Sequence, residues 1–196
     1  MNLPNKLTAS RFILTAAFLA VMFSEVPYHR TIALALFVAA GISDFLDGQI
    51  ARRRRLITNF GILMDPLADK IMVCSAFIAF VGLKWLPAWM AVIVVARELT
   101  ITGLRLLAAS KSVVLAAERY GKHKTVSQIT AIIAIFILQS YDQWGDIGIW
   151  IFGARIGNEP WTWWFAEIAK WVAVFLTFIS GWFYLWRNRA LYLDDM

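Results

Sequence analysis

The sequence predicts an all-α integral membrane protein, in which a short N-terminal interfacial segment precedes one bundle of six transmembrane helices. Hydrophobic residues make up 60% of the 196 residues and charged residues only 16%, whereas soluble domains average about 45–50% and roughly 25%. Six apolar stretches are long enough to cross a bilayer, which takes ~20 helical residues. They lie near 7–25, 31–52, 60–82, 88–108, 125–141 and 163–186. Since they leave no room for a soluble domain, residues 1–196 form a single membrane domain.

The first apolar stretch follows a polar segment, MNLPNKLTAS. This segment is expected to lie at the membrane interface, with Thr8 or Ser10 capping the helix that follows. Lys6 and Arg11 ahead of an apolar run resemble the start of a signal peptide. No small-residue cleavage site follows, so we expect an uncleaved first helix.

Turn-forming residues separate the apolar stretches: Pro27, Pro87, Gly121, Gly153 and Pro160. The longest connection, 142–162, is rich in tryptophan. These tryptophans could form a binding surface, although an anchoring belt at the bilayer interface is the commoner use of tryptophan. The residues concerned are Trp144, Trp150, Trp161, Trp163 and Trp164.

Lysines and arginines are concentrated at one side of the predicted bundle, which marks that side, with both termini, as cytoplasmic. The net charge of +6 favours contact with anionic membrane lipids, and no nucleic-acid motif is present. The basic side carries Lys6, Arg52, Arg53, Arg54, Arg55, Lys111, Arg119, Lys122, Lys124, Arg187 and Arg189, and the other side only Arg30, Lys84 and Arg155.

Four aspartates occupy the cytoplasmic ends of the second and third predicted helices. Asp44 and Asp47 are three residues apart, and Asp65 and Asp69 are four apart, so each pair projects from one face, separated by about 60° and about 40°. Each charge in the middle of a membrane helix costs ~2.5–3.5 kcal/mol. Four carboxylates therefore indicate a function.

An oxygen-only set of ligands favours Mg²⁺ or Mn²⁺. Four carboxylates can hold two such ions about 3.5–4 Å apart, an arrangement suited to phosphoryl transfer. The alternative is ion pairing between the helices, with the arginines at 52–55 or with Lys70. Gly48, Ala51 and Gly61 would allow close approach of a ligand, or of a neighbouring helix.

Together these residues spell DxxDGxxAR, eight further residues, and GxxxDxxxD over residues 44–69. The pattern resembles the signature of the CDP-alcohol phosphatidyltransferase family in every position. NLPNKLTASR, MDPLADK, ARELTITGLRLL and GKHKT resemble the branch of that family that uses glycerol 3-phosphate as acceptor. The resemblance implies a multi-pass enzyme of the bacterial cytoplasmic membrane, typically a homodimer, that makes phosphatidylglycerophosphate from CDP-diacylglycerol.

The resemblance also implies roles for individual residues. Asp44, Asp47 and Asp65 would hold two divalent ions, with Asp69 as a further ligand and the general base. The residues expected to contact CDP-diacylglycerol are Gly48, Ala51, Arg52, Thr58 and Gly61, with Asn5 and Thr8 on the nucleotide side.

The acceptor carries its own phosphate and needs cations, because arginine binds phosphate in bidentate geometry and lysine acts as a point charge. We expect Arg105, Lys122 and Lys124 to bind this phosphate, together with Arg11. For both lysines, topology setting is an alternative, and Arg97 could equally form an ion pair with its neighbour Glu98.

Other functions remain possible at this stage. The same chemistry could serve inositol phosphate, serine or phosphatidylglycerol as acceptor. A divalent-ion transporter would also place carboxylates in membrane helices, but the aspartates cluster at one interface only. A lipid-binding scaffold would leave their regular spacing unexplained. Cys74, the only cysteine, is expected to be an inert packed thiol.

Overall fold

The computed structural model describes residues 3–54, 59–111, 113 and 119–193, and side chains over 10–43, 70–111, 113 and 123–192. This part of the chain is predominantly helical, as predicted. Its long helices are α1 (Leu3–Met22), α2 (His29–Arg54), α3 (Asn59–Gly82), α4 (Ala88–Ser110), α5 (Arg119–Ser140) and α7 (Trp161–Arg187).

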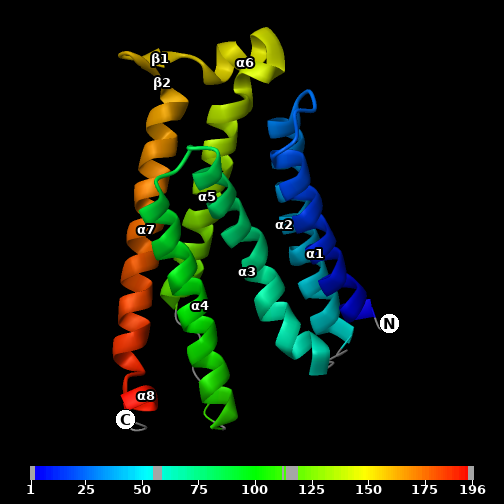
Figure 1. Ribbon diagram of the computed structural model, residues 1–196, viewed down its shortest axis with the longest axis vertical. Coiled ribbons are helices and arrows are strands. Elements are labelled where there is room, and N and C mark those ends of the chain that lie inside the picture. Colours follow the sequence, from blue (N-terminus) through cyan, green and yellow to red (C-terminus); the bar gives the residue numbers. More distant parts are fainter. Residues whose placement is uncertain (1–2, 55–58, 112, 114–118, 194–196) are drawn as a thin grey trace.

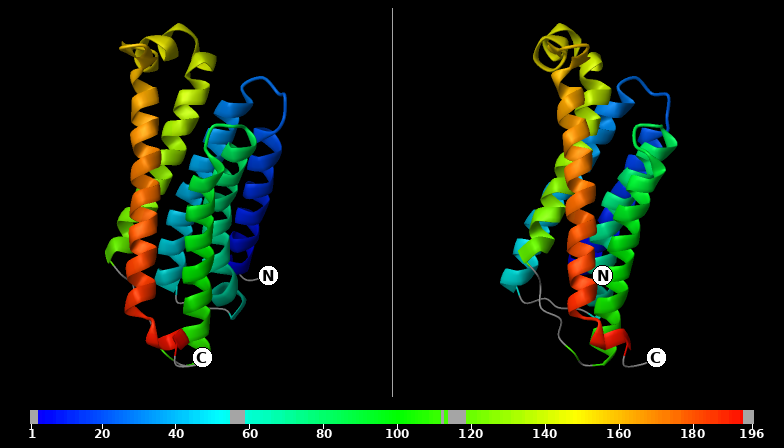
Figure 2. Two further views of the ribbon diagram at one scale, coloured as in Figure 1. Left: turned by 60° about the vertical axis from the view of Figure 1, so that its left-hand side comes forward. Right: turned by 90° about the vertical axis from the view of Figure 1, so that its left-hand side faces the viewer.

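The long helices run alternately up and down, side by side (Figures 1 and 2). The starts of α1, α3 and α5 and the ends of α2, α4 and α7 lie at one end, which we call the lower end of the bundle (Figure 1). A short helix, α8 (Ala190–Leu193), follows α7 at this end. The sites predicted on different helices therefore share one end.

The upper end carries a small cap between α5 and α7. It contains the 3₁₀ helix η1 (Tyr141–Trp144), the helix α6 (Gly145–Phe152), and a two-stranded antiparallel hairpin of β1 (Arg155–Ile156) and β2 (Glu159–Pro160). Gly157, with φ +68°, supplies the left-handed residue of the hairpin turn. The hairpin is a departure from the all-α prediction.

The tryptophans of the predicted belt differ in their contacts and exposure at the cap. The indole of Trp144 donates a hydrogen bond to Thr31 Oγ1 (2.9 Å) and that of Trp161 to the carbonyl of Ile151 (2.9 Å), so both lie against the protein. Trp150 is 82% exposed and Trp164 47% exposed. Trp144 and Trp150 therefore differ clearly, the one bonded to α2 and the other exposed.

The first helix differs from the prediction because α1 already begins at Leu3. From Leu3 onward the polar segment is thus part of α1, and neither Thr8 nor Ser10 can cap it. Pro4 lies in the first turn, where its missing N–H costs nothing, and no helix-breaking residue follows. Expecting a separate segment and a cap at these positions was wrong, whereas a position at the membrane interface stays a prediction.

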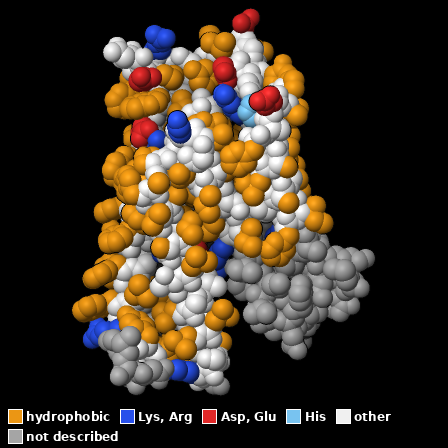
Figure 3. All heavy atoms as spheres, in the orientation of Figure 1, with side chains coloured by type: hydrophobic (Ala, Val, Ile, Leu, Met, Phe, Trp, Pro, Cys, Tyr) orange, Lys and Arg blue, Asp and Glu red, His pale blue; other side chains and the backbone are white. Residues whose placement is uncertain are grey.

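Within the described residues, two helical stretches are long and apolar enough to cross a membrane, His123–Phe152 and Trp161–Arg187. Ser10–Met22, His29–Ser43 and Lys70–Gly82 are shorter apolar helices. Large hydrophobic side chains such as Phe175 (63% exposed) cover the outside of α7. Figure 3 shows hydrophobic side chains along the flank of the bundle and charged ones mostly toward its ends. This distribution fits a helical membrane protein.

An aromatic cluster joins four helices in the upper part of the bundle. Phe136 of α5 packs against Phe80 of α3 (ring centroids 5.1 Å apart), Phe18 of α1 (6.0 Å) and Phe37 of α2 (6.5 Å). Phe18, Phe80 and Phe136 are fully buried and Phe37 is 5% exposed. The edge-to-face geometry of Phe136 with Phe18 and Phe80 is favourable for aromatic rings.

Buried alanines bring α5 and α7 together: Ala131 and Ala134 of α5 meet Ala166, Ala169 and Ala173 of α7. Small side chains allow two helix backbones to approach closely, which is how helices pack tightly in lipid. The contact fixes α7 along the length of α5. It thereby sets the position of the polar residues farther down both helices.

Candidate active site

The four aspartates lie on the two helices predicted to carry them. Asp44 and Asp47 are on the final turns of α2, and Asp65 and Asp69 on the first turns of α3. Both stretches are at the lower end of the bundle (Figure 1), and α1 packs against both helices. Carboxylates alone form a ligand set that fits a hard divalent cation.

The side chains of these aspartates lie outside the described residues, and so do those of most predicted donor-binding residues. Asn5 and Thr8 are on α1, Gly48, Ala51 and Arg52 on α2, and Gly61 on α3; Thr58 is outside the described chain altogether. Among the side chains that the structure describes, no group of three or more potential metal ligands occurs.

Charged and polar side chains of α4, α5 and α7 meet inside the bundle, and we call this group the polar cluster. It consists of Arg97 and Glu98 of α4, Lys124 and Gln128 of α5, and Thr177 of α7. Glu98 and Lys124 are each only 4% exposed, Gln128 is 1% exposed and Thr177 is fully buried. A group this polar and this buried needs internal partners.

The carboxylate of Glu98 is the centre of the cluster. Its Oε1 pairs with the Lys124 ammonium and lies 3.3 Å from Arg97 Nη1. The side-chain amide of Gln128 donates to the same oxygen (3.5 Å) and to Thr177 Oγ1 (2.9 Å). Glu98 therefore connects α4 to α5 directly, and to α7 through Gln128.

Arg97 is held from the other side by α7. A Cβ atom added to Gly181 would lie 2.9 Å from Arg97 Cγ, so the absence of a side chain at Gly181 leaves room for the arginine stem. The sequence left open whether Arg97 pairs with Glu98 or binds substrate. The structure shows the ion pair.

Arg105 lies two turns below Glu98 on α4, and on nearly the same face because seven residues turn a helix through about 700°. Its Nε donates a hydrogen bond to the Tyr184 hydroxyl (3.2 Å), and its guanidinium lies 5.6 Å from the centre of that ring. Tyr184 is buried, whereas Arg105 is exposed. Arg105 is thus anchored at its stem and accessible.

The structure places the cations predicted to bind the acceptor phosphate in different parts of the bundle. Lys124 of α5 pairs with Glu98 of α4, and Arg105 of α4 bonds to Tyr184 of α7. Arg11 is half-buried on α1, which packs against α2 and α3, and the Lys122 side chain lies outside the described residues. His123, within α5, is exposed. A role in setting the orientation of the helices in the membrane would not by itself explain why Lys124 is buried.

Three residues of this region escaped the sequence reasoning: Gln128, Thr177 and Tyr184. A signal for them existed, because Gln128 follows Lys124 by four residues and Tyr184 follows Thr177 by seven. Both spacings place two polar side chains on one face of an apolar helix. Single hydroxyl or amide groups in membrane helices are common, however, since they also join helices.

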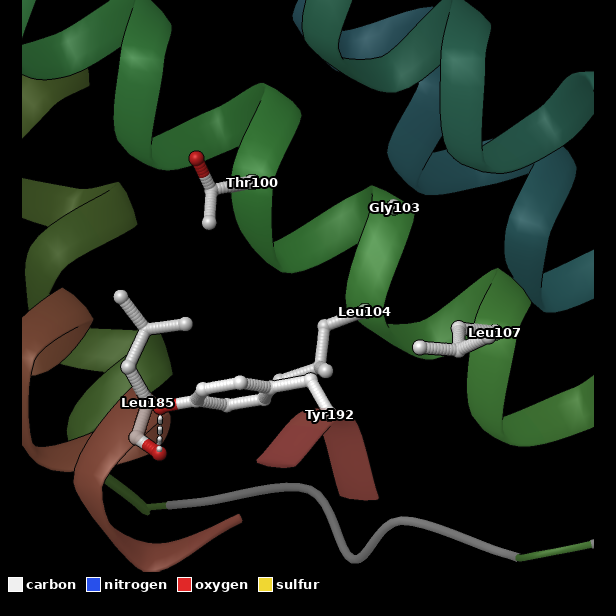
Figure 4. Close-up of a pocket in the computed structure, with 6 residues that line it drawn as sticks. All are labelled: Thr100, Gly103, Leu104, Leu107, Leu185 and Tyr192. Atoms are coloured by element: carbon white, nitrogen blue, oxygen red, sulfur yellow. Dashed lines mark hydrogen bonds between the residues drawn. The ribbon is translucent and has the colours of Figure 1, made fainter. Parts of the chain in front are cut away.

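A cavity of about 320 Å³ opens between α4 and the α7–α8 corner. Figure 4 shows its lining residues, with the Tyr192 hydroxyl directed at the carbonyl of Leu185 (3.2 Å). The lining comprises Thr100, Gly103, Leu104, Leu107, Leu185 and Tyr192. Among the described residues that line the cavity, none is charged.

The helical bundle, with two helices that each carry a pair of aspartates, defines a class of membrane enzyme. The family model of CDP-alcohol phosphatidyltransferases matches residues 1–179, and the chain belongs to this family. A curated relative from Bacillus subtilis, a CDP-diacylglycerol–glycerol-3-phosphate 3-phosphatidyltransferase, is 36% identical over 199 aligned residues, covering 95% of each chain.

Two further relatives carry the same name. The protein from Cereibacter sphaeroides is 31% identical and covers 99% of this chain and 98% of its own length. The protein from Rickettsia prowazekii is 34% identical and covers 93% of each chain. The similarity therefore extends over nearly the whole chain.

Proposed function

We propose that this protein transfers a phosphatidyl group from CDP-diacylglycerol to sn-glycerol 3-phosphate, giving phosphatidylglycerophosphate and CMP. Near full-length similarity to relatives named for this reaction is the observation that carries the proposal. The signature over residues 44–69 falls within the matched family domain. The reaction joins a lipid donor to a soluble acceptor, which suits a site at one end of a membrane bundle.

The four aspartates would hold two divalent cations, Mg²⁺ or Mn²⁺. When bound, these ions would neutralise the pyrophosphate of the donor and stabilise the departing CMP. An all-carboxylate set at the ends of α2 and α3 supports this assignment, because such oxygens suit hard ions. Asp44, Asp47 and Asp65 would serve as ligands only.

Asp69 would act as the general base as well as a ligand. The acceptor hydroxyl has a pKa far above neutral, so a base within hydrogen-bond reach must accept its proton as it attacks the lipid-side phosphorus. Donor contacts would come from Gly48, Ala51, Arg52, Thr58 and Gly61, with Asn5 and Thr8 on the nucleotide side.

Arg105 and Lys124 would bind the acceptor phosphate. They come from two helices, α4 and α5, that reach the lower end, where the aspartates also lie. The exposed guanidinium of Arg105 can form bidentate hydrogen bonds to a phosphate, and Lys124 adds a second positive charge. Lys122 and Arg11 would add further charge at the entrance.

The lower end would face the cytoplasm of a bacterium, with six spans and both termini on that side, in the cytoplasmic membrane. The excess of Lys and Arg in the sequence segments at this end supports the orientation. A homodimer embedded in membrane lipid would be the working form, with residues 1–196 as one domain.

The test is a transferase assay with purified protein, CDP-diacylglycerol and four separate acceptors: glycerol 3-phosphate, inositol phosphate, serine and phosphatidylglycerol. We expect CMP release and lipid product with glycerol 3-phosphate only. Asp69→Asn should be inactive, whereas Asp146→Asn, which changes an exposed aspartate of the upper cap, should be fully active. Product formation with another acceptor alone would overturn the proposed reaction.

A further inference from the structure

Glu98 differs from the other charged residues of the polar cluster because it is the group on which the rest converge. Lys124, Arg97 and Gln128 all direct a donor at its Oε1. A long flexible side chain such as that of lysine loses much rotational freedom when it is held in one place. Glu98 supplies the contact that holds it.

The register of the helices places the Lys124 ammonium at a defined height. In α4 and α7, which both run downward (Figure 1), Glu98 precedes Arg105 by seven residues and Thr177 precedes Tyr184 by seven. Gln128 connects Glu98 with Thr177, which form the upper level. Arg105 and Tyr184 form the lower level and are joined by their own hydrogen bond. Because α5 runs upward, the backbone of Lys124 lies about 6 Å below that of Gln128, and its side chain reaches up to Glu98, where the ammonium pairs with Oε1.

The cations of this region suit an anion. Among the described side chains, Lys124 and Arg97 both contact Glu98, and Arg105 is exposed below them. A phosphate monoester carries close to two negative charges at neutral pH. A phosphate placed between Lys124 and Arg105 would therefore meet a cation from each of two helices.

We propose that Glu98 is a positioning residue for the acceptor: its carboxylate, oriented by Gln128 and Thr177, holds Lys124 beside Arg105 so that the acceptor phosphate meets two cations already in place. This inference rests on the proposed function. It adds a residue that contacts the phosphate only through Lys124, and it extends the acceptor site to α7.

The principal test compares Glu98→Gln with the wild type in purified, Mg²⁺-loaded enzyme. Gln keeps the size of the side chain and an acceptor oxygen for Gln128, but removes the charge that holds Lys124. Losing a hydrogen bond between charged groups typically changes affinity by about tenfold or more. We expect the KM for glycerol 3-phosphate to rise at least about tenfold, with the KM for CDP-diacylglycerol within about twofold.

The matched control is Glu167→Gln. Glu167 also pairs with a lysine, Lys170, on the upper half of α7, so the same change is made at an ion pair away from the lower end. Both KM values should be unaltered in this variant. Thr177→Val, which removes the acceptor for Gln128 at constant shape, should raise the KM for glycerol 3-phosphate by a smaller factor than Glu98→Gln.

A double variant separates positioning from folding. Lys124→Met with Glu98→Gln removes both members of the Glu98–Lys124 pair, so the lysine that Glu98→Gln alone leaves facing a neutral amide is gone, and thermal stability should recover relative to Glu98→Gln alone. The KM for glycerol 3-phosphate should stay as high as in Lys124→Met. Recovery of acceptor affinity together with stability would show that the cluster is structural and overturn the inference.

Failure of this inference is distinguishable from failure of the proposed reaction. An active wild type with an unchanged acceptor KM in both Glu98→Gln and Thr177→Val would refute the role of Glu98 alone. If the wild type used inositol phosphate instead, the proposed reaction would be wrong, and the same KM comparison would still decide the role of Glu98. Use of serine alone, which has no phosphate, would refute both.

Discussion

Phe136→Ala should destabilise the protein strongly, because this ring joins α5 to three other helices. Phe136 is fully buried and packs against Phe18, Phe37, Phe80 and Trp85. Replacing a buried Phe by Ala costs about 3–5 kcal/mol in tightly packed cores. Two of its neighbours are themselves fully buried, so little side-chain movement can fill the space, and we expect a loss within that range.

The measurement is the free energy of unfolding in mixed micelles, from titration with denaturing detergent followed by far-ultraviolet circular dichroism. Phe175→Ala is the matched control, because the same atoms are removed from a side chain that is 63% exposed on α7. Its effect should be under about 0.5 kcal/mol. Equal losses in both variants, or less than about 1 kcal/mol for Phe136→Ala, would refute the packing argument.

Three further predictions concern the site. Asp69→Asn should abolish turnover while the protein still folds and inserts; synthase activity in the metal-loaded variant would exclude Asp69 as the base. Asp44→Asn should raise the Mg²⁺ or Mn²⁺ concentration needed for half-maximal activity, and an unaltered requirement would remove Asp44 from the ligand set. Gly181→Ala should displace Arg97, since the new Cβ would lie 2.9 Å from Arg97 Cγ. The strain should lower stability by about 1–3 kcal/mol, whereas a neutral effect would mean that the arginine moves aside freely.

The helical architecture followed from the sequence because apolar stretches of the required length were separated by turn residues. The predicted 60–82 and 88–108 agree closely with α3 (Asn59–Gly82) and α4 (Ala88–Ser110). Helix starts were less predictable. A fifth stretch expected near 125 begins at Arg119, because Gly121 falls in the first turn, where a glycine does not end a helix.

This earlier start explains why the surroundings of Lys124 could not be predicted. In a loop, Lys124 would be exposed to water. Within α5, its side chain projects from the same face as Gln128 and contacts Glu98. Thr177, which accepts a hydrogen bond from Gln128, lies 49 residues away in sequence. Only the packing of α5 on α7, through buried alanines, brings them together.

The polar cluster is difficult to explain by stability alone. A buried ion pair must overcome the cost of removing both charges from water, and replacing such a pair by apolar side chains of similar volume is often neutral or stabilising. Glu98 and Lys124 are each 4% exposed, so the cost applies to both. Holding Lys124 in place for the phosphate of the acceptor, as proposed above, is a function that would justify this cost.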